Sequence, residues 1–267
     1  MVVKVGTRVL THPGGRLALS RIHRLIETLS NLHADREVLL VSSGAVGLGQ
    51  EALGLTAPPT ELSLRQACAS IGQIRLMEIY QRGFERMSVV TAQLLLIASD
   101  FEDAERFANL QHAVETLLAR RVLPIINEND VVATEELRLP DGSSTAGGFG
   151  DNDHLSALVA SRLRGDLLVL CTDVDGVYDR DPRRDPSANR LETVSNPVGL
   201  ELGGPDVGGR GGMASKVSAA RLASRAGCEV VIVSGMEEQA LAQVFEGKTV
   251  GSHFPVSSPT PKREEER

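Results

Sequence analysis

Short, almost wholly apolar segments alternate with longer segments of helical spacing along most of this chain, and this alternation constrains the fold most. The segments expected to be strands are residues 2–5, 37–42, 89–93, 122–126, 167–172 and 230–234. Those expected to be helical are residues 17–32, a stretch from Ser43 to 53, 62–86 as one or two helices, 103–120, 152–163 and 213–226. Such a pattern is typical of an α/β fold whose mainly parallel sheet is covered on both faces. Ligand loops are then expected at the strand ends.

Composition excludes several classes of function. The net charge of −7 argues against a broad nucleic-acid-binding surface, and the 3% aromatic content without Trp argues against base stacking. Cys68, Cys171 and Cys228 are too far apart for a zinc motif, so buried free thiols are expected. A strand at residues 2–5 leaves no room for a signal peptide, and no apolar run approaches about 20 residues. We expect a cytoplasmic protein without nucleic-acid or membrane partners.

Two clusters of carboxylates and amides carry most of the functional information. Residues 127–130 (NEND) end an apolar run, and residues 150–153 (GDND) open a helix. Asp151 or Asn152 could cap that helix, but three consecutive polar side chains exceed what one cap needs. Asp153 could pair with a lysine and hold it towards a phosphate. Groups of these kinds can recognise an amine and a carboxylate, or orient phosphate and metal.

Two lysines lie beside glycines that could admit a phosphate. Lys4 is inside an apolar strand before Gly6, so it either has a buried anionic partner or faces solvent on an edge strand. Lys216 follows the glycine-rich residues 208–212 by about one helical turn, where main-chain donors and an ammonium can reach phosphate oxygens. A surface loop is the alternative for this segment. The segment does not match the P-loop pattern of nucleoside triphosphatases.

Other polar residues follow predicted strands. Ser42 and Ser43 could bind an anion, although capping the next helix is the commoner role of such residues. Thr172-Asp173 follows an apolar strand and is the better ligand candidate, whereas Asp175 before a glycine favours a turn. His154 has no second histidine nearby, which favours a helix-surface residue over a metal ligand. We therefore assign no metal ligands.

Taken together, these residues resemble the amino acid kinase family. Seven segments carry the resemblance in order and with similar spacing: VVKVGTRVL at 2–10, VSSGAVGLG at 41–49, ASIGQIRLM at 69–77, INENDVVAT at 126–134, GDNDHLSALVA at 150–160, LCTDVDGVYDRDPR at 170–183 and GGMASKVSAA at 211–220. Their order and approximate spacing agree with the family across nearly the whole chain. The INEND and GDND sequences are similar to those of the branch that phosphorylates glutamate.

The resemblance implies a three-layer αβα sandwich, with a catalytic domain over residues 1–256 and a polar, disordered tail over 257–267. It implies ATP-dependent, Mg²⁺-assisted phosphorylation of the γ-carboxylate of L-glutamate to L-glutamyl 5-phosphate, the first step of proline biosynthesis, by direct in-line transfer. It also implies a homo-oligomer (dimer or tetramer), feedback binding of proline, and hand-off of the product to the next enzyme of that pathway. Many relatives carry a C-terminal PUA domain, which this chain is expected to lack.

The resemblance also implies a role for individual residues. Lys4 and Lys216 would contact the transferring phosphoryl group, and Asp153 would orient both lysines. The residues expected to bind glutamate are Ser43, Asn127, Asp130 and Asn152. The residues expected to surround ATP are Lys4, Thr172, Asp173, Arg210, Gly211, Gly212, Met213, Ala214, Ser215 and Lys216.

The chain departs from the family pattern in three places. Arg8 replaces a small hydroxyl residue, Arg210 replaces a small residue before Gly-Gly-Met, and the connection 135–149 is longer. This connection is expected to form a hairpin that turns at residues 140–142. Two alternatives remain open: a kinase for another small carboxylate or carbamate acceptor, and a non-catalytic homologue that senses ATP or an amino acid.

Overall fold

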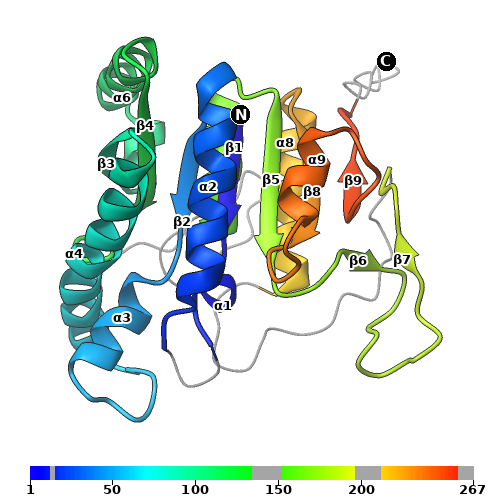
Figure 1. The fold of residues 1–267 in the computed structure, drawn as a ribbon, viewed down its shortest axis with the longest axis horizontal. Coiled ribbons are helices and arrows are strands. Elements are labelled where there is room, and N and C mark those ends of the chain that lie inside the picture. Colours follow the sequence, from blue (N-terminus) through cyan, green and yellow to red (C-terminus); the bar gives the residue numbers. More distant parts are fainter. Residues whose placement is uncertain (13–15, 134–151, 196–211, 258–267) are drawn as a thin grey trace, which may run out of the picture.

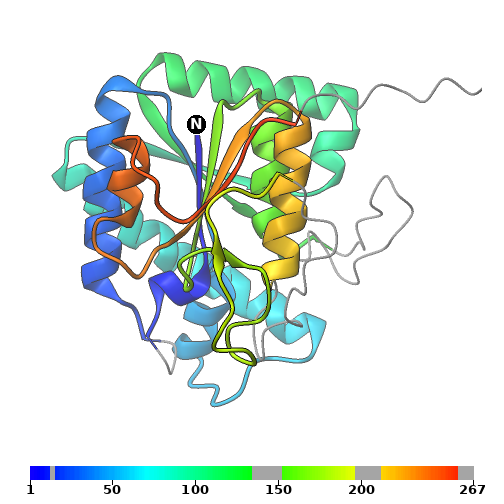
Figure 2. The ribbon, with the colours of Figure 1, turned by 90° about the vertical axis from the view of Figure 1, so that its right-hand side faces the viewer.

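The fold is built on one seven-stranded sheet in the order β3-β4-β2-β1-β5-β8-β9 (Figures 1 and 2). The computed structural model describes residues 1–12, 16–133, 152–195 and 212–257. The strands are β1 (Val2–Val5), β2 (Leu39–Ser42), β3 (Val90–Leu96), β4 (Val122–Glu128), β5 (Leu167–Thr172), β8 (Glu229–Ser234) and β9 (Ser252–Phe254). All neighbours are parallel except β9, which pairs antiparallel with β8. A separate antiparallel pair joins β6 (Val177–Tyr178) to β7 (Arg190–Leu191).

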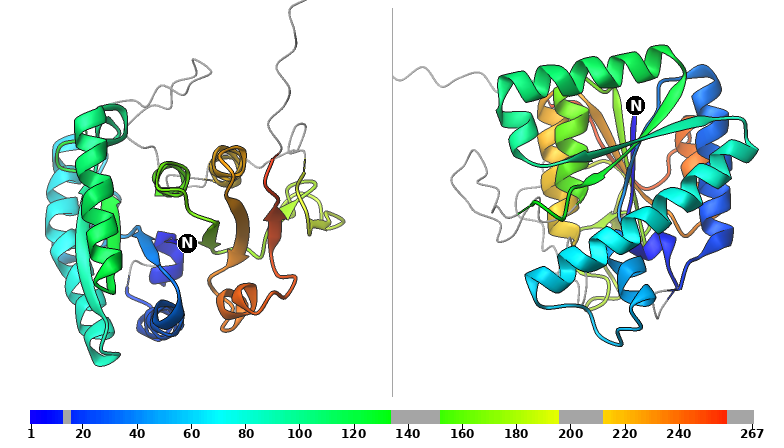
Figure 3. Two further views of the ribbon diagram at one scale, coloured as in Figure 1. Left: turned by 90° about the horizontal axis from the view of Figure 1, so that it is seen from above. Right: turned by 90° about the vertical axis from the view of Figure 1, so that its left-hand side faces the viewer.

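Helices cover both faces of the sheet, which gives the three layers seen from above in Figure 3. One face carries α1 (Thr7–Leu10), α2 (Leu19–Asp35), α3 (Ala45–Ala52), α4 (Leu62–Arg86) and α9 (Ala240–Phe245). The other carries α5 (Ser99–Glu102), α6 (Ala104–Ala119), α7 (Asn152–Arg162) and α8 (Met213–Arg225). Each face has its own apolar cluster, so the expected αβα sandwich is confirmed.

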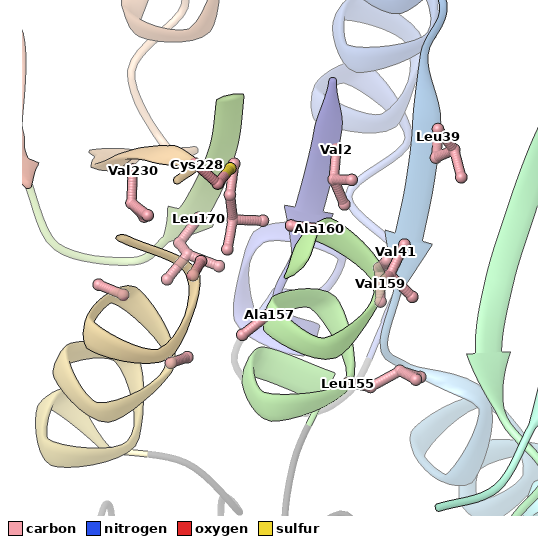
Figure 4. Close-up of a cluster of buried hydrophobic side chains, with 14 of the residues drawn as sticks. Val2, Leu39, Val41, Leu155, Ala157, Val159, Ala160, Leu170, Cys228 and Val230 are labelled. Carbon is pink, nitrogen blue, oxygen red and sulfur yellow. The ribbon is translucent and has the colours of Figure 1, made fainter. Parts of the chain in front are cut away.

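The pleat of β1 explains where Lys4 points. Val3 and Val5 belong to the cluster beneath α2 and α4, whereas Val2 belongs to the cluster beneath α7 and α8. Because side chains alternate along a strand, Lys4 shares the face of Val2. Figure 4 shows Val2 and Val41 on that face, near Ala160 and Val159 of α7. Strand β1 is central and Lys4 is 4% exposed, so the edge-strand alternative for this lysine is wrong.

The parallel strands end at one edge of the sheet, and this places the polar motifs together. Strands β1, β2, β4 and β5 run parallel, so the residues that follow them meet at their common carboxyl edge. The chain moves from β1 to β2 on one side and from β5 to β8 on the other. The order therefore reverses at the boundary of β1 and β5, where α/β sheets form ligand crevices.

Helices α3 and α4 touch backbone to backbone. A Cβ atom on Gly72 would lie 1.7 Å from the Ala45 carbonyl oxygen, and one on Gly49 would lie 1.8 Å from that of Cys68. No side chain fits at either position without moving a helix. Segment 62–86 is one continuous 25-residue helix, held tightly against the element that follows β2.

The predicted order of the long elements is confirmed, while several boundaries and short elements differ. Strand β4 continues to Glu128 and β3 to Leu96, beyond the predicted ends at 126 and 93. The elements α1, α5, α9, β6, β7 and β9 were not predicted. Each has only two to six residues, which is too short to show a periodic pattern of apolar residues. The three cysteines are buried, as expected.

Two predictions lie outside the part of the chain that the structure describes. These are the hairpin within 135–150 and nearly all of the tail predicted for 257–267. Among the helices of the described ranges, none is both long and apolar enough to cross a lipid bilayer.

Candidate active site

A buried carboxylate between two lysines forms the centre of the site. Lys4 Nζ donates to Asp153 Oδ1, and Lys216 Nζ donates to Asp153 Oδ2 at 3.2 Å. Asp153 is completely buried, while Lys4 and Lys216 are 4% and 7% exposed. Burial alone would raise the pKa of Asp153, but the charges and hydrogen bonds of the two lysines hold that pKa below its ordinary value. The cluster therefore carries a net positive charge, which suits an anionic ligand.

Three elements bring this cluster together. Lys4 comes from the pleat of β1, and Asp153 is the second residue of α7. Lys216 is in the first turn of α8, where its backbone N–H donates to the Gly212 carbonyl oxygen at 3.3 Å. A carboxylate near a helix N-terminus is favoured by the helix dipole, and main-chain N–H groups there can donate hydrogen bonds to phosphate oxygens. The predicted pairing of Asp153 with both lysines is confirmed as geometry.

A second group of residues, which we call the amide cluster, comprises Gln73, Asn127 and Asn152 with Ser43. Asn152 Nδ2 lies 3.0 Å from Ser43 Oγ, 2.9 Å from Asn127 Oδ1 and 3.1 Å from the Ser42 carbonyl oxygen. Asn127 Nδ2 in turn donates to Gln73 Oε1 at 2.8 Å. Three of the four expected glutamate-binding residues therefore lie together.

The capping alternatives for Ser42, Ser43 and Asn152 are wrong. The N-cap of α3 is Gly44, with φ of 109°, and no side chain caps that helix. Ser42 Oγ instead donates to the Ser43 carbonyl oxygen and lies 2.8 Å from Tyr80 Oη. The Asn152 side chain points across to the ends of β2 and β4 rather than to its own helix. Asp151 lies outside the described residues.

The fourth expected residue, Asp130, follows β4 and is partly buried. Burial raises the pKa of its carboxyl, and the charge of Arg65 opposes that shift. Nearby, Gln66 Nε2 donates to the Val131 carbonyl oxygen at 3.0 Å. Helix α4 therefore forms a wall along the end of β4, and its residues Arg65, Gln66 and Gln73 received no role in the sequence analysis. The available signal was a glutamine inside the matching segment 69–77.

A cavity of about 580 Å³ opens on the other side of the lysine pair. Its lining includes Arg8, Thr172, Asp173, Met213, Lys216 and Met236. This volume is within the range of about 300–1,000 Å³ typical of small-molecule sites. The cavity lies at the carboxyl ends of β1, β5 and β8, where the reversal of strand order predicts a ligand crevice.

Arg8 holds the carboxylate that was expected to bind nucleotide. Arg8 Nη1 donates to Asp173 Oδ2 at 2.9 Å, and Thr172 Oγ1 donates to Asp173 Oδ1 at 3.1 Å. Burial alone would raise the pKa of Asp173, but the bonds from Arg8, the backbone and Thr172 together hold it below its ordinary value. The Arg8 side chain is 47% exposed, so this pair is accessible to a ligand. Arg8 was noted as a departure and was not assigned to the site.

The other expected nucleotide-binding residues divide into three groups. Thr172, Asp173, Met213 and Lys216 line the cavity. Gly212, Ala214 and Ser215 are at the start of α8 but are not in the lining, and Lys4 is connected to the cavity through Asp153 and Lys216. Arg210 and Gly211 lie outside the described residues.

The turn reading of Asp175 is supported. Its carboxylate accepts hydrogen bonds from Tyr178 Oη at 3.0 Å and from Arg190 Nη1 at 3.4 Å, and Gly176 follows with φ of 155°. His154 is partly buried rather than fully on the helix surface, and burial lowers its pKa.

In the described ranges, no group of three or more His, Cys, Asp or Glu residues is arranged to hold a metal ion. Mg²⁺ usually keeps several waters and binds through one or two carboxylates together with substrate phosphates. Asp173 on the cavity wall is a carboxylate suited to that mode. The donor set therefore fits a Mg²⁺ ion that enters with a nucleotide rather than one held by a protein cage.

Known proteins resemble the chain along nearly its whole length. A glutamate 5-kinase of Symbiobacterium thermophilum is 42% identical over 258 residues, which are 95% of each chain. A glutamate 5-kinase of Acinetobacter baumannii is 43% identical over 95% of this chain, which spans 66% of that relative's length.

Solved structures with low identity share the fold. Isopentenyl phosphate kinase of T. acidophilum, in a product complex, has a TM-score of 0.64 at 17% identity, over 95% of this chain and 99% of that one. Carbamate kinase from Giardia lamblia, bound to AMP-PNP, has a TM-score of 0.64 at 18% identity, over 96% and 97% of the two chains.

The family profile described as "Amino acid kinase family" matches residues 1–234, which contain every residue of the lysine–carboxylate and amide clusters. With that match, the close relatives and the shared fold, the chain belongs to the amino acid kinase family.

Proposed function

We propose that this protein transfers the γ-phosphoryl group of ATP to the γ-carboxylate of L-glutamate and releases L-glutamyl 5-phosphate and ADP. The observation that carries the proposal is the position of Lys4, Asp153 and Lys216. Lys216 lines the cavity suited to a nucleotide, and Asn152, next to Asp153, belongs to the amide cluster. Two cations are thus held between a nucleotide-sized cavity and a set of oriented amides. Relatives at 42–43% identity that are named glutamate 5-kinase support the choice of acceptor.

Nucleotide binding is proposed to use the cavity. Thr172 and Asp173 would contact the nucleotide from the end of β5, while Met213 and Lys216 would contact it from the start of α8. Residues 210–215 complete the expected ATP-binding set, with main-chain donors at the helix N-terminus suited to phosphate. Bound Mg²⁺ would neutralise part of the phosphate charge, and Asp173 is one of the carboxylates on the cavity wall that could hold it.

Acceptor binding is proposed to use the amide cluster and Asp130. The Asp130 carboxylate would pair with the α-ammonium of glutamate, and the Ser43 hydroxyl and backbone donors after β2 would receive its α-carboxylate. Asn152 and Asn127 would then fix the position of the side chain. Neutral donors suit this role, because a zwitterion needs oriented hydrogen bonds more than additional net charge.

The transfer step needs no general base, since a carboxylate is already ionised at neutral pH. A γ-carboxylate oxygen attacks the γ-phosphorus, a new P–O bond forms, and the bond from phosphorus to the β,γ-bridging oxygen breaks. ADP carries away the electron pair, and no proton has to move. Lys4 and Lys216 would stabilise the charge that develops on the transferring group, and Asp153 keeps both ammonium groups in place. Positioning and cationic neutralisation therefore provide the catalysis.

The proposal is tested by measuring ADP release from ATP and Mg²⁺ with L-glutamate, D-glutamate, N-acetylglutamate and aspartate in parallel. Hydroxylamine in the assay traps an acyl phosphate as its hydroxamate. We expect ADP release that depends on L-glutamate, with an equal amount of hydroxamate. Turnover with a different acceptor alone would overturn the substrate, and ATP binding without any turnover would indicate a sensor instead of an enzyme.

Several wider features belong to the same proposal and follow from the family resemblance. We propose one catalytic unit over residues 1–256 in a homo-oligomer of the cytoplasm, with proline as feedback inhibitor and direct hand-off of the labile acyl phosphate. Light scattering measures the size of the homo-oligomer, and an inhibition assay tests the effect of proline. Neither measurement depends on turnover with other acceptors.

A further inference from the structure

A chain of side-chain amides runs from the middle of α4 to the start of α7. Gln73 Oε1 accepts from Asn127 Nδ2 at 2.8 Å, and Asn127 Oδ1 accepts from Asn152 Nδ2 at 2.9 Å. Asn152 Nδ2 also reaches Ser43 Oγ at 3.0 Å. Gln73 is therefore one hydrogen bond away from Asn127 and two away from Asn152, the two amides that the proposed function places on the acceptor.

The hydrogen-bond pattern fixes the orientation of each amide. Asn127 Oδ1 accepts from the Glu128 backbone N–H at 2.9 Å as well as from Asn152. Because both of these partners are donors, the oxygen of Asn127 has to face them and its Nδ2 group has to face Gln73. A flipped Asn127 would turn its NH₂ group against two other donors. Gln73 is the residue that accepts from Asn127 Nδ2 and keeps it unflipped.

Burial makes this orientation costly to lose. Asn127 and Gln73 are 2% and 9% exposed, so water does not readily replace a missing partner. The backbone contact of Gly72 with Ala45 fixes the position of the neighbouring Gln73 against the start of α3, two residues after Ser43. Leaving a buried donor without an acceptor costs more than the hydrogen bond itself contributes.

Two atoms of the chain of amides have no partner among the described residues. These are the buried Gln73 Nε2 and Asn152 Oδ1, a donor and an acceptor. Buried polar groups are nearly always hydrogen-bonded, so such atoms call for an explanation. Of the two, Asn152 Oδ1 belongs to a residue that the proposed function places on the acceptor, and it could accept from the ammonium group of an amino acid.

From these contacts we propose that Gln73 is a positioning residue of the acceptor site, which orients Asn152 through Asn127. The inference rests on the proposed function and adds a residue on α4 to it. Gln73 is not among the residues that line the cavity, so we expect its effect to be confined to the acceptor. Removing it should weaken acceptor binding without changing nucleotide binding.

The test compares Gln73→Met with Gln50→Met as a matched control. Methionine retains the length of glutamine but cannot accept from Asn127. Gln50 has a comparable single side-chain bond, from Nε2 to the Leu55 carbonyl oxygen at 3.3 Å, outside the amide cluster. For Gln73→Met we expect KM for L-glutamate to rise about tenfold, the size of effect that an unpaired buried donor produces, with KM for ATP within about twofold. Gln50→Met should leave both constants unchanged.

A double-mutant cycle with Asn127→Leu separates positioning from a general structural effect. If Gln73 acts through Asn127, adding Gln73→Met to Asn127→Leu causes no further loss of kcat/KM for L-glutamate. Additive losses, or KM values for glutamate and ATP that rise together, would overturn the inference. Should Gln73→Met not fold, Gln73→Glu retains an oxygen for Asn127. It should keep KM for ATP unchanged and KM for glutamate below the value found for Asn127→Leu. A higher value would also overturn the inference.

The unmutated chain makes the two proposals separable. Its failure to phosphorylate L-glutamate would overturn the proposed function, and with it the role assigned to Gln73. Normal turnover of the unmutated chain with unchanged constants in Gln73→Met would overturn the role of Gln73 alone.

Discussion

The two ligand regions on either side of the lysine pair hold their polar groups in opposite ways. The cavity is bordered by the accessible ion pair of Arg8 with Asp173, in which the arginine is about half exposed. The amide cluster is neutral, with Gln73 and Asn127 buried and Ser43 and Asn152 partly buried, and its members bond to one another through fixed donors and acceptors. One region relies on charge near solvent, and the other on oriented hydrogen bonds away from it.

Under the proposed function, this difference would let one site accept a highly charged nucleotide and still select a small acceptor. Partly solvated charges attract polyphosphate but discriminate little between one anionic ligand and another, because each exposed ion pair contributes only about 0–1 kcal/mol of interaction free energy. Buried amides discriminate strongly, since an analogue that lacks a matching group leaves them unpaired. We therefore expect substitutions in the cavity to change nucleotide constants modestly and substitutions in the amide cluster to change acceptor selection.

The largest effect is expected where the two regions meet. Asp153→Asn removes the countercharge of two buried lysines, and breaking a buried ion pair costs about 3–5 kcal/mol. The free energy of unfolding from urea denaturation measures this loss. Glu246→Gln is the control, because its pair with Lys248 is more than half exposed and should contribute almost nothing. Equal effects of both substitutions would contradict the central place given to Asp153.

The difference in unfolding free energy between the unmutated chain and Asp153→Asn should also depend on pH. The pKa of Asp153 is depressed in the folded state, so its stabilisation is fully present above the ordinary carboxyl pKa. It is lost as the pH falls through the lower folded-state pKa. The difference in unfolding free energy between the unmutated chain and Asp153→Asn should therefore stay constant from pH 7 down to about 4 and shrink only below that value.

A loss of rate with little change in the fold is expected for Lys216→Ala. It removes one of the two cations from the proposed transition state but leaves the bond between Lys4 and Asp153. Loss of one such electrostatic contact typically lowers kcat by about 10²–10³-fold. The measurement is kcat at saturating ATP and L-glutamate, with Lys248→Ala as a lysine substitution on the surface. A Lys216→Ala variant that retains the unmutated kcat would remove this lysine from the mechanism.

A smaller effect, restricted to the nucleotide, is expected for Arg8→Ser. The substitution restores the small hydroxyl residue of the family pattern and releases Asp173 from its 2.9 Å contact. We expect KM for ATP to rise about threefold to tenfold and KM for L-glutamate to stay constant, with stability lowered by less than about 1 kcal/mol. Steady-state kinetics with each substrate varied in turn measure both KM values. A change in KM for L-glutamate alone would contradict the assignment of the Arg8 region to the nucleotide.

The smallest effect is expected for Tyr80→Phe behind the amide cluster. Tyr80 is completely buried, burial raises the pKa of its hydroxyl, and that hydroxyl lies 2.8 Å from Ser42 Oγ. Loss of one neutral hydrogen bond should lower the free energy of unfolding by about 1 kcal/mol, with KM for L-glutamate changed less than about twofold. A larger kinetic change would place Ser42 within the acceptor site itself.

The sequence allowed the sheet and the centre of the site to be predicted, because both depend on long-range regularities. Apolar strands and amphipathic helices have a period that can be read directly, while the pairing of Asp153 with Lys4 and Lys216 was implied by the resemblance to the family. The amide partners were not predictable in the same way. Gln73 is one polar residue inside a helix, and its meaning depends on the end of β4 lying opposite it, a contact between residues 54 positions apart. The capping roles of Ser42, Ser43 and Asn152 failed for the same reason, since tertiary partners outcompeted local ones.

The glycine contact between α3 and α4 has a mechanical consequence. Two helices whose backbones touch at Gly49 and Gly72 cannot slide past each other, so they move as one rigid body. Helix α4 has 25 residues, and the Gln73 contact is close to its midpoint. A tilt of α4 at its distal end around Arg86 would therefore be carried along the helix to Gln73 and, through its hydrogen bond, to Asn127. Sensitivity of the acceptor site to distant events would then require no moving loop.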